Sequence, residues 1–370
     1  AAQGARSGHR MTPLAGLIAA QIAASGPMRL DEYMRLCLMH PRHGYYATRD
    51  PFGAAGDFTT APEISQMFGE MIGLALAQGW HDQGRPSPFT LAEIGPGRGT
   101  LMADILRAIR VMPGMAEAAE VVLIEVSPHL RKVQRARLGD VRHLDSAADL
   151  PQKPLFLVAN EFFDALPIRQ FQRVDGGWAE HVVHLDAAGA LALGLAAPVP
   201  GPDAALGEIR ETCPEAGPIV TSIAERIAAH GGLAILLDYG NWQGRGDTFQ
   251  ALRRHAPDDP LAHPGEADLT AHVDFAPLAL AALAAGARVS GMVTQGDWLM
   301  RLGINARAER LAQAGDGGAM AALHRLTAPG EMGHLFKALA LWAPGAPVPP
   351  GFEPSEQDAH DAGNPDPSPA

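Results

Sequence analysis

The first 85 residues carry apolar positions at the spacing of α-helices. Three stretches show this pattern, at residues 14–22, 30–39 and 63–78. In the first of them Leu14, Ile18 and Ile22 fall on one helical face, as expected for an amphipathic helix that packs on a core. We therefore expect an α-helical N-terminal lead-in over residues 11–85, preceded by a flexible N-terminus of small and polar residues at 1–10.

From about Thr90 the chain alternates short apolar runs with amphipathic helices. The expected strands are residues 90–94, 121–126, 155–159 and 233–237, and the expected helices among them are residues 101–111, 128–138 and 219–229. Unbroken apolar runs are typical of strands buried on both faces, and the strand-helix-strand rhythm predicts parallel pairing. The sequence thus predicts an α/β fold with a doubly wound, mostly parallel sheet over residues 86–342.

This core is expected to carry one insertion and an unpacked tail. Residues 178–195 read as a β-hairpin that turns at Asp186-Ala187-Ala188-Gly189, and residues 198–218 as a Pro- and Gly-rich connection, so the insertion covers about 175–217. A helix at 275–284 and apolar runs at 287–293 and 335–341 complete the sheet. Residues 343–370 contain much Pro, Asp and Gly and are expected to be disordered.

The turn after the first core strand carries the first sign of chemistry. It reads Glu93-Ile94-Gly95-Pro96-Gly97-Arg98-Gly99, and glycines between a strand and a helix let the backbone approach a ligand closely. The dinucleotide pattern would need glycine at position 100, which is Thr, and no Gly-Lys-Ser/Thr follows, so NAD and the phosphate loop fit poorly. The turn instead resembles motif I of class I methyltransferases, which bind S-adenosylmethionine.

An acidic residue at the end of the next strand supports this interpretation. Glu125 follows the run that ends at Ile124, and a carboxylate at that point accepts ribose hydroxyl protons in nucleoside sites of doubly wound folds. Asp145, after the run 141–144, is a weaker candidate for the adenine amino group. The alternative is that the glycines form an ordinary turn and Glu125 is a solvated strand end.

Composition restricts the classes of partner and compartment. A formal charge of −12 disfavours non-specific binding to nucleic acid or to anionic membranes. No apolar run approaches the roughly 20 residues that span a bilayer, so membrane insertion is not expected. Cys37 and Cys213 are far apart and the histidines show no metal spacing, so neither a disulfide nor a metal site is expected. We expect a cytoplasmic protein.

Three further motifs carry a family resemblance. They are Gly56-Asp57-Phe58-Thr59-Thr60-Ala61-Pro62-Glu63-Ile64-Ser65-Gln66, Asn160-Glu161-Phe162-Phe163-Asp164-Ala165-Leu166-Pro167 and Asp268-Leu269-Thr270-Ala271-His272-Val273-Asp274-Phe275. In this order, over residues 11–342, the chain resembles the MidA-like family, whose mitochondrial members are complex I assembly methyltransferases. The resemblance implies a class I methyltransferase core, S-adenosylmethionine as cofactor and, for the mitochondrial members, dimethylation of an arginine on a complex I subunit. The composition looks bacterial, and a eukaryotic source would place the chain in the mitochondrial matrix.

These motifs add candidate site residues. Asp57, Thr59 and Glu63 lie in a loop that could cover the cofactor, and Asn160 ends a core strand where it could touch the cofactor too. Glu161 and Asp164 are the candidate clamps for a guanidinium group, because carboxylates match its planar donors. His272, with Asp274, is a candidate proton acceptor. The alternative for Glu161 and Asp164 is a helix start stabilised by the macrodipole.

Three functions stay open on the sequence alone. The leading hypothesis is a protein arginine N-methyltransferase whose partner is an arginine-bearing protein subunit. A small-molecule O- or N-methyltransferase is the second, since the cofactor turn is generic. The third is an assembly factor that binds a client protein and uses the cofactor for structure or regulation. A homodimer is the oligomeric state that we also expect.

Overall fold

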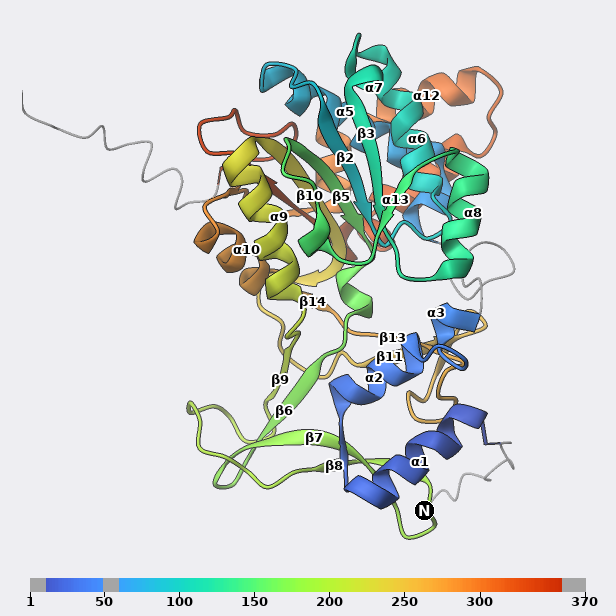
Figure 1. Cartoon of the computed structure of the whole chain (residues 1–370), viewed down its shortest axis with the longest axis vertical. Helices are drawn as coiled ribbons and strands as arrows, with labels where there is room; N and C mark the ends of the chain where they lie inside the picture. The colour runs from blue at the N-terminus through green and yellow to red at the C-terminus, as the bar shows by residue number, and fades with distance from the viewer. Residues whose placement is uncertain (1–10, 49–59, 355–370) are drawn as a thin grey trace, which may run out of the picture. The chain divides into compact units, whose positions relative to one another are not determined.

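The computed structural model describes residues 11–48 and 60–354, and these form two compact units. Of the described residues, the smaller unit draws on 11–48, 165–215 and 244–272, and the larger on 60–164, 216–243 and 273–354. The chain therefore enters the smaller unit three times, and the helical segment that follows residue 60 belongs to the larger unit (Figure 1). The candidates Asp57 and Thr59 lie outside the described residues.

The larger unit is built on a nine-stranded sheet. Its main path runs β15-β17-β10-β5-β2-β3-β4, with β14 paired to β10 and β16 to β17. The strands are β2 (Phe89–Ile94), β3 (Ala119–Ile124), β4 (Arg142–Leu144), β5 (Leu155–Asn160), β10 (Gly232–Asn241), β14 (Val273–Asp274), β15 (Arg288–Val289), β16 (Val293–Thr294) and β17 (Phe336–Trp342). Strands β4, β3, β2, β5 and β10 are parallel, and β17 runs antiparallel to β10. The predicted doubly wound, mostly parallel α/β sheet is confirmed.

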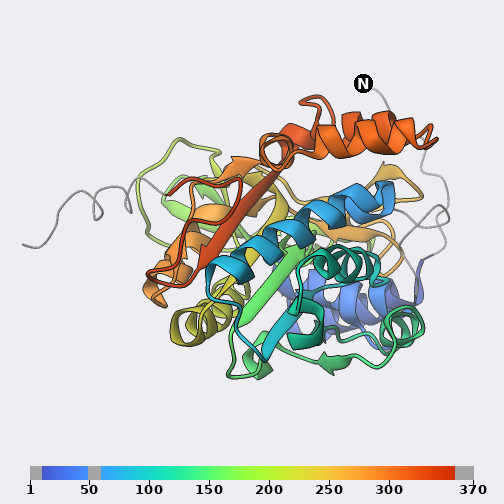
Figure 2. The same cartoon turned by 90° about the horizontal axis from the view of Figure 1, so that it is seen from above.

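Helices cover both faces of this sheet. They are α4 (Ala61–Ile64), α5 (Gln66–Asp82), α6 (Thr100–Ala108), α7 (Met115–Ala118), α8 (Pro128–Leu138), α9 (Ala216–His230), α10 (Phe275–Ala284), α11 (Gln295–Arg301), α12 (Ile304–Gln313), α13 (Ala319–Thr327) and α14 (Met332–Leu335), with one-turn 3-10 helices η1 (Ile109–Val111), η2 (Ala147–Asp149) and η3 (Phe163–Ala165). Helix α5 lies along one face beside the orange C-terminal helices (Figure 2), whereas α9 packs against β5, β10 and β17 and contacts α10. Burial on both faces explains why β2 and β5 contain buried residues throughout.

The smaller unit combines helices with antiparallel sheets. A five-stranded sheet has the order β1-β7-β6-β9 with β8 on β7, and a three-stranded sheet has the order β12-β11-β13. The elements are α1 (Pro13–Ser25), β1 (Met28–Arg29), α2 (Leu30–Met39), α3 (Tyr45–Thr48), β6 (Arg169–Val174), β7 (Gly177–Leu185), β8 (Leu191–Leu195), β9 (Ile209–Thr212), β11 (Gln250–Arg253), β12 (Ala256–Asp258) and β13 (Asp268–Thr270). The predicted hairpin is confirmed as β7–β8, and Asp186 accepts the N–H groups of Ala188 and Ala190 in its turn.

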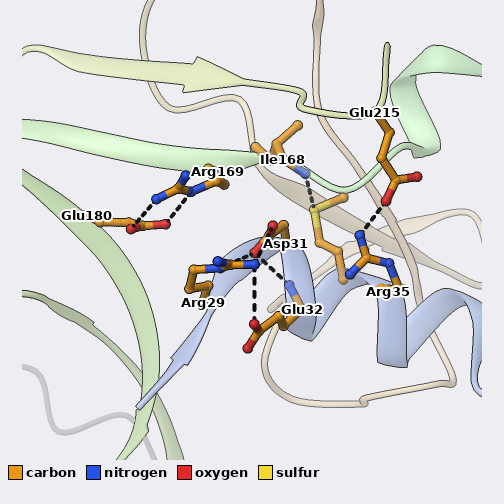
Figure 3. Close-up of polar contacts among 9 residues, drawn as sticks. Arg29, Asp31, Glu32, Arg35, Ile168, Arg169, Glu180 and Glu215 are labelled. Atoms are coloured by element: carbon orange, nitrogen blue, oxygen red, sulfur yellow. Dashed lines mark hydrogen bonds and ion pairs between the residues drawn. The ribbon is translucent and has the colours of Figure 1, made fainter. Parts of the chain in front are cut away.

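The predicted connection at 198–218 is wrong for residues 209–212. These form β9, which pairs with β6, because Ile209 and Arg210 continue the ladder opposite Gln172 and Phe171. Ion pairs also join separate segments of this unit (Figure 3). Arg169 holds both carboxylate oxygens of Glu180 at 2.7 and 2.8 Å, and Arg35 of α2 pairs with Glu215.

Residues 343–354, which were expected to be disordered, pack on the larger unit. Phe352 is buried, its ring lies 5.3 Å from that of Trp298, and the Trp298 indole donates to the Pro350 carbonyl oxygen at 3.1 Å. The buried Phe352 side chain and hydrogen bonds such as that of the Gly291 N–H to the Glu353 carbonyl oxygen hold this segment on the larger unit. Residues 355–370 lie outside the described residues.

Replacing Phe352 with alanine should therefore lower the free energy of unfolding by about 3 kcal/mol, since it empties a buried aromatic site. Chemical denaturation followed by fluorescence measures the change. Val348→Ala in the same segment is the control, because Val348 is 37% exposed, and should cost less than about 1 kcal/mol. Equal effects of the two substitutions would show that the segment does not contribute to the core.

Candidate cofactor and acceptor site

The glycine turn between β2 and α6 adopts a backbone that side chains disfavour. Gly95, Gly97 and Gly99 have φ values of 63°, 51° and 76°. These lie in the left-handed region, which glycine enters without a steric penalty. A Cβ atom at Gly95 would also lie 2.9 Å from the Phe162 ring, so glycine is required there twice over. Gly99 precedes the first turn of α6, in which the Met102 backbone N–H donates to the Glu93 carboxyl group.

Glu93 places a carboxyl group under this turn. It is 3% exposed, and its Oε2 has no hydrogen-bond partner within the part of the chain that the structure describes. The pKa of Glu93 is raised to about 8: burial is the largest cause, the Glu125 charge adds to it, and the hydrogen bond from the Met102 backbone N–H opposes both. A buried acceptor without a partner suits a ligand that brings its own donor or positive charge.

Glu125 follows β3, next to the same turn. Ser127 donates its backbone N–H to Oε1 at 2.7 Å, and the Gln134 amide donates to Oε2 at 3.3 Å. Burial raises the pKa of Glu125, and these two donors oppose that shift. Asp145 lies one residue beyond β4, where its exposed carboxylate pairs with Arg131 at 2.5 Å. Contact of Asp145 with an adenine group stays a prediction.

Asn160 and Glu161 form the next part of the site, at the end of β5. The Asn160 amide and the Ala61 backbone N–H both donate to Glu161 Oε1 at 3.0 Å, while Asn160 Oδ1 is a buried oxygen with no partner among the described residues. Glu161 has φ of 50°, which a non-glycine residue adopts only at a cost. Its pKa is raised to about 7, chiefly by burial and also by the nearby charge of Asp164.

Asp238 holds the turn that carries these acidic residues. Its Oδ2 accepts the backbone N–H groups of Phe162, Phe163 and Asp164 at 3.1, 2.9 and 3.3 Å, and its Oδ1 accepts that of Tyr239 at 2.9 Å. Asp238 is fully buried, and burial together with the charges of Asp164 and Glu161 raises its pKa. Asp164 lies in the one-turn helix η3, so the turn concentrates three carboxyl groups.

The remaining candidates divide between the units. Glu63 on α4 reaches the glycine turn, because the Thr100 hydroxyl donates to its Oε1 at 2.6 Å. His272 belongs to the smaller unit, where its backbone N–H donates to the Thr248 hydroxyl at 2.8 Å, and its role as proton acceptor stays a prediction. Asp274 belongs to the larger unit and caps α10 through its side chain.

Two residues at the site were missed by sequence reasoning, Asp238 and Gln134. Asp238 directly follows the apolar run 233–237, so an acidic residue at the carboxyl end of a parallel strand was the available signal. Gln134 lies four residues after Leu130 on the buried face of α8, where a polar residue is out of place. Within residues 11–48 and 60–354, the structure shows no group of three or more His, Cys, Asp or Glu side chains that could hold a metal ion.

The geometry fits S-adenosylmethionine. Glu93 Oε2 and Asn160 Oδ1 are buried acceptors without partners, which suit the amino and sulfonium end of the cofactor, and Glu125 at the next strand end suits the ribose. The glycine turn leaves room for close approach of the ligand to the backbone. The cofactor, when bound, supplies an activated methyl group.

Comparison with known proteins decides the family. The profile of a family described as “Putative S-adenosyl-L-methionine-dependent methyltransferase” matches residues 71–293. The chain is 37% identical to the Drosophila melanogaster protein named “Protein arginine methyltransferase NDUFAF7 homolog, mitochondrial”, over 91% of this chain and 86% of that one. The chain belongs to this methyltransferase family.

Other relatives extend the similarity. The Homo sapiens protein named “Protein arginine methyltransferase NDUFAF7, mitochondrial” is 35% identical over 80% of this chain and 75% of its own. A Burkholderia thailandensis protein, solved with S-adenosyl-homocysteine bound, superposes with a TM-score of 0.80 at 28% identity, covering 91% of this chain and 93% of that one. The expected MidA-like membership, class I methyltransferase fold and cofactor are confirmed: this chain is an S-adenosylmethionine-dependent methyltransferase.

Gly95→Ala should weaken S-adenosyl-homocysteine binding at least tenfold, because the added methyl group displaces Phe162 and strains the turn. Titration calorimetry measures the affinity. Gly114→Ala is the matched control: Gly114 has φ of 84°, and a methyl group on its Cα would have no neighbouring atom within 4 Å. If both variants lose the same affinity, general backbone strain and not the glycine turn is responsible.

The raised pKa of Glu93 predicts a pH dependence of stability in the ligand-free protein. Between about pH 4.3, where an unfolded glutamate titrates, and about pH 8, the folded state keeps a proton that the unfolded state has released. The free energy of unfolding therefore falls as pH rises through this window, by at most about 1.4 kcal/mol per pH unit for one group. Glu93→Gln should make this decline shallower in denaturation curves from pH 5 to 8, whereas exposed Glu117→Gln should not. A wild-type slope in Glu93→Gln would rule out the buried proton.

Proposed function

We propose that this methyltransferase acts on the guanidinium group of an arginine in a protein partner. The observation that carries the proposal is the turn 161–164, on which Glu161 and Asp164 lie close enough to raise the pKa of Glu161, next to Asn160. Two carboxyl groups facing one cation match the planar donors of a guanidinium group. The names of the relatives, protein arginine methyltransferases, support the same acceptor.

The carboxyl groups would have two tasks in the reaction. Before transfer, Glu161 and Asp164 orient the guanidinium plane so that one nitrogen lies in line with the methyl group. As that nitrogen gains the methyl group it loses a proton, and the methylated guanidinium keeps its single positive charge. Glu161, whose pKa burial raises to about 7, is suited to accept this proton near neutral pH.

The fixed geometry of the turn supports these tasks. The Glu161 carboxylate is held by Asn160 and Ala61, and three backbone N–H groups of the turn donate to Asp238. A rigid carboxylate keeps its alignment with the acceptor without losing conformational entropy at each turnover. Asp57, Thr59 and Glu63 as cofactor contacts, and His272 as a second proton acceptor, remain part of the proposal.

The partner and compartment belong to the same proposal. We propose an arginine-bearing protein subunit, of the respiratory-complex type that the family resemblance implies, as the partner. A bacterial chain would act in the cytoplasm, and a eukaryotic one in the mitochondrial matrix, as the relatives' names state for those proteins. In the described part of the chain no helix has the length and apolar character to cross a membrane.

Glu161→Gln should reduce methyl transfer at least 100-fold and leave the affinity for S-adenosyl-homocysteine within about threefold, because the change removes the charge and the proton acceptor but keeps the shape. Transfer from methyl-labelled cofactor is measured in lysate from cells that lack the protein. Hydrolysis and amino acid analysis then identify the labelled residue. Exposed Glu309→Gln is the control and should behave as wild type.

Each outcome of this assay separates the hypotheses. Methylarginine in polypeptides, lost in Glu161→Gln, supports the proposal. Label that appears only in small molecules would overturn it in favour of a small-molecule methyltransferase. If neither protein nor small molecules are labelled and client assembly survives both Glu161→Gln and Gly95→Ala, the chain acts as a client-binding assembly factor.

A further inference from the structure

Gln134 connects the two halves of the cofactor site from behind. The residue is fully buried on α8, and its amide nitrogen donates to the Gly97 carbonyl oxygen at 2.7 Å and to Glu125 Oε2 at 3.3 Å. Its stem packs beneath the turn, since a Cβ atom at Gly99 would lie 3.6 Å from Gln134 Cγ. One side chain therefore contacts the glycine turn after β2 and the carboxylate after β3.

The direction of the Gln134 amide is fixed by its surroundings. Its nitrogen faces two acceptors, and its Oε1 lies 2.8 Å from His143 Nε2 on β4. A reversed amide would turn its oxygen toward the Gly97 carbonyl and the Glu125 carboxylate, which offer no hydrogen. His143 must then carry a proton on Nε2 to donate to Gln134. Burial, Arg135 and Arg131 lower the pKa of His143, which favours the neutral ring.

The consequence for Glu125 follows from its hydrogen bonds. The backbone N–H groups of Ser127 and Val126 bind the Glu125 carboxylate, and Gln134 is the side chain that binds Oε2 and so fixes its rotation. Oxygen atoms in a carboxylate accept more than one hydrogen bond, so both keep capacity for hydroxyl donors of a ligand. The orientation of that remaining capacity depends on Gln134.

We infer that Gln134 is a positioning residue of the cofactor site, which aligns Glu125 with the ribose hydroxyls and couples it to the glycine turn. The inference rests on the assignment of Glu125 to the ribose. Gln134 itself does not need to touch the cofactor. Its effect is on selectivity for the ribose hydroxyls, because only that contact requires the carboxylate to point in one direction.

The test compares two ligands of the purified protein. S-adenosyl-homocysteine and an analogue with both ribose hydroxyls replaced by hydrogen are titrated by calorimetry, and the ratio of their affinities measures the hydroxyl contact. If the Glu125 carboxylate accepts hydrogen bonds from both ribose hydroxyls, the wild type should bind S-adenosyl-homocysteine about 100-fold or more tightly than the analogue. In Gln134→Leu, which keeps the volume and loses both donors, the ratio should fall at least tenfold. An unchanged ratio would overturn the inference.

Matched variants separate this role from a general loss of packing. Gln295→Leu replaces another fully buried glutamine, which donates to the Leu326 carbonyl oxygen at 3.0 Å. Gln295 begins α11, which packs next to β17, and β17 lies three strands away from β2 in the sheet. It should leave the ratio unchanged even if it lowers the melting temperature. The same fall in ratio in Gln295→Leu would show that loose packing causes the effect.

A second variant covers the case in which Gln134→Leu does not fold. His143→Phe keeps Gln134 but removes the donor that fixes the direction of its amide. The ratio of the two ligand affinities should then fall about threefold or more. An unchanged ratio would again overturn the inference. Glu125→Gln distinguishes the two assignments. If it leaves the ratio at the wild-type value, the ribose role of Glu125 fails; if it lowers the ratio while Gln134→Leu does not, only the role of Gln134 fails.

Discussion

Parallel pairing of β2, β3, β5 and β10 is the constraint on which the larger unit depends. The register sets Ile94 beside both Ile124 and Ala159, and Asn160 beside Leu237, so these strands end at one edge of the sheet. Glu125 and Glu161 directly follow β3 and β5, and Asp238 lies within β10 beyond its pairing with Asn160. These three residues are brought to one edge although more than a hundred positions separate the first from the last. Strand ends at a common edge are where open α/β sheets bind ligands, because the backbone dipoles and loop residues converge there.

The same edge gathers acidic groups in a buried setting. Glu93, Glu125, Glu161 and Asp238 all have raised pKa values, with burial as the largest cause in each case. Folding alone would not favour such a set, because each charged carboxylate loses its hydration. A methyltransferase makes use of it: the cofactor carries a sulfonium and an ammonium group, and the proposed acceptor carries a guanidinium group. The buried carboxyl groups lower the stability of the ligand-free protein, and binding of cationic ligands at the site stabilises the folded state again.

Backbone N–H groups and the neutral amides of Asn160 and Gln134, not side-chain cations, hold these carboxylates in place. Asp238 accepts four N–H groups, Glu161 accepts one from Ala61, and Glu125 accepts one from Ser127. An N–H donor orients a carboxylate without cancelling its charge, which leaves the negative potential available to a ligand. The unfavourable φ of Glu161 is part of this arrangement, since the N–H groups on Asp238 fix the turn against that strain.

The sequence by itself determined the α/β class, the cofactor and much of the cofactor site, because these rest on local patterns. Apolar runs and helical spacing mark the strands and helices of the core, and the glycine turn with Glu93 and Glu125 is contiguous with two of those strands. Only the tertiary structure decided that residues 11–48, 165–215 and 244–272 form one unit, that β9 joins its sheet and that Phe352 packs on Trp298. It also decided the parts played by Asp238 and Gln134. The physical reason is that antiparallel pairing, aromatic packing and buried hydrogen bonds join residues that are distant along the chain, and no local pattern records which distant group will be the partner.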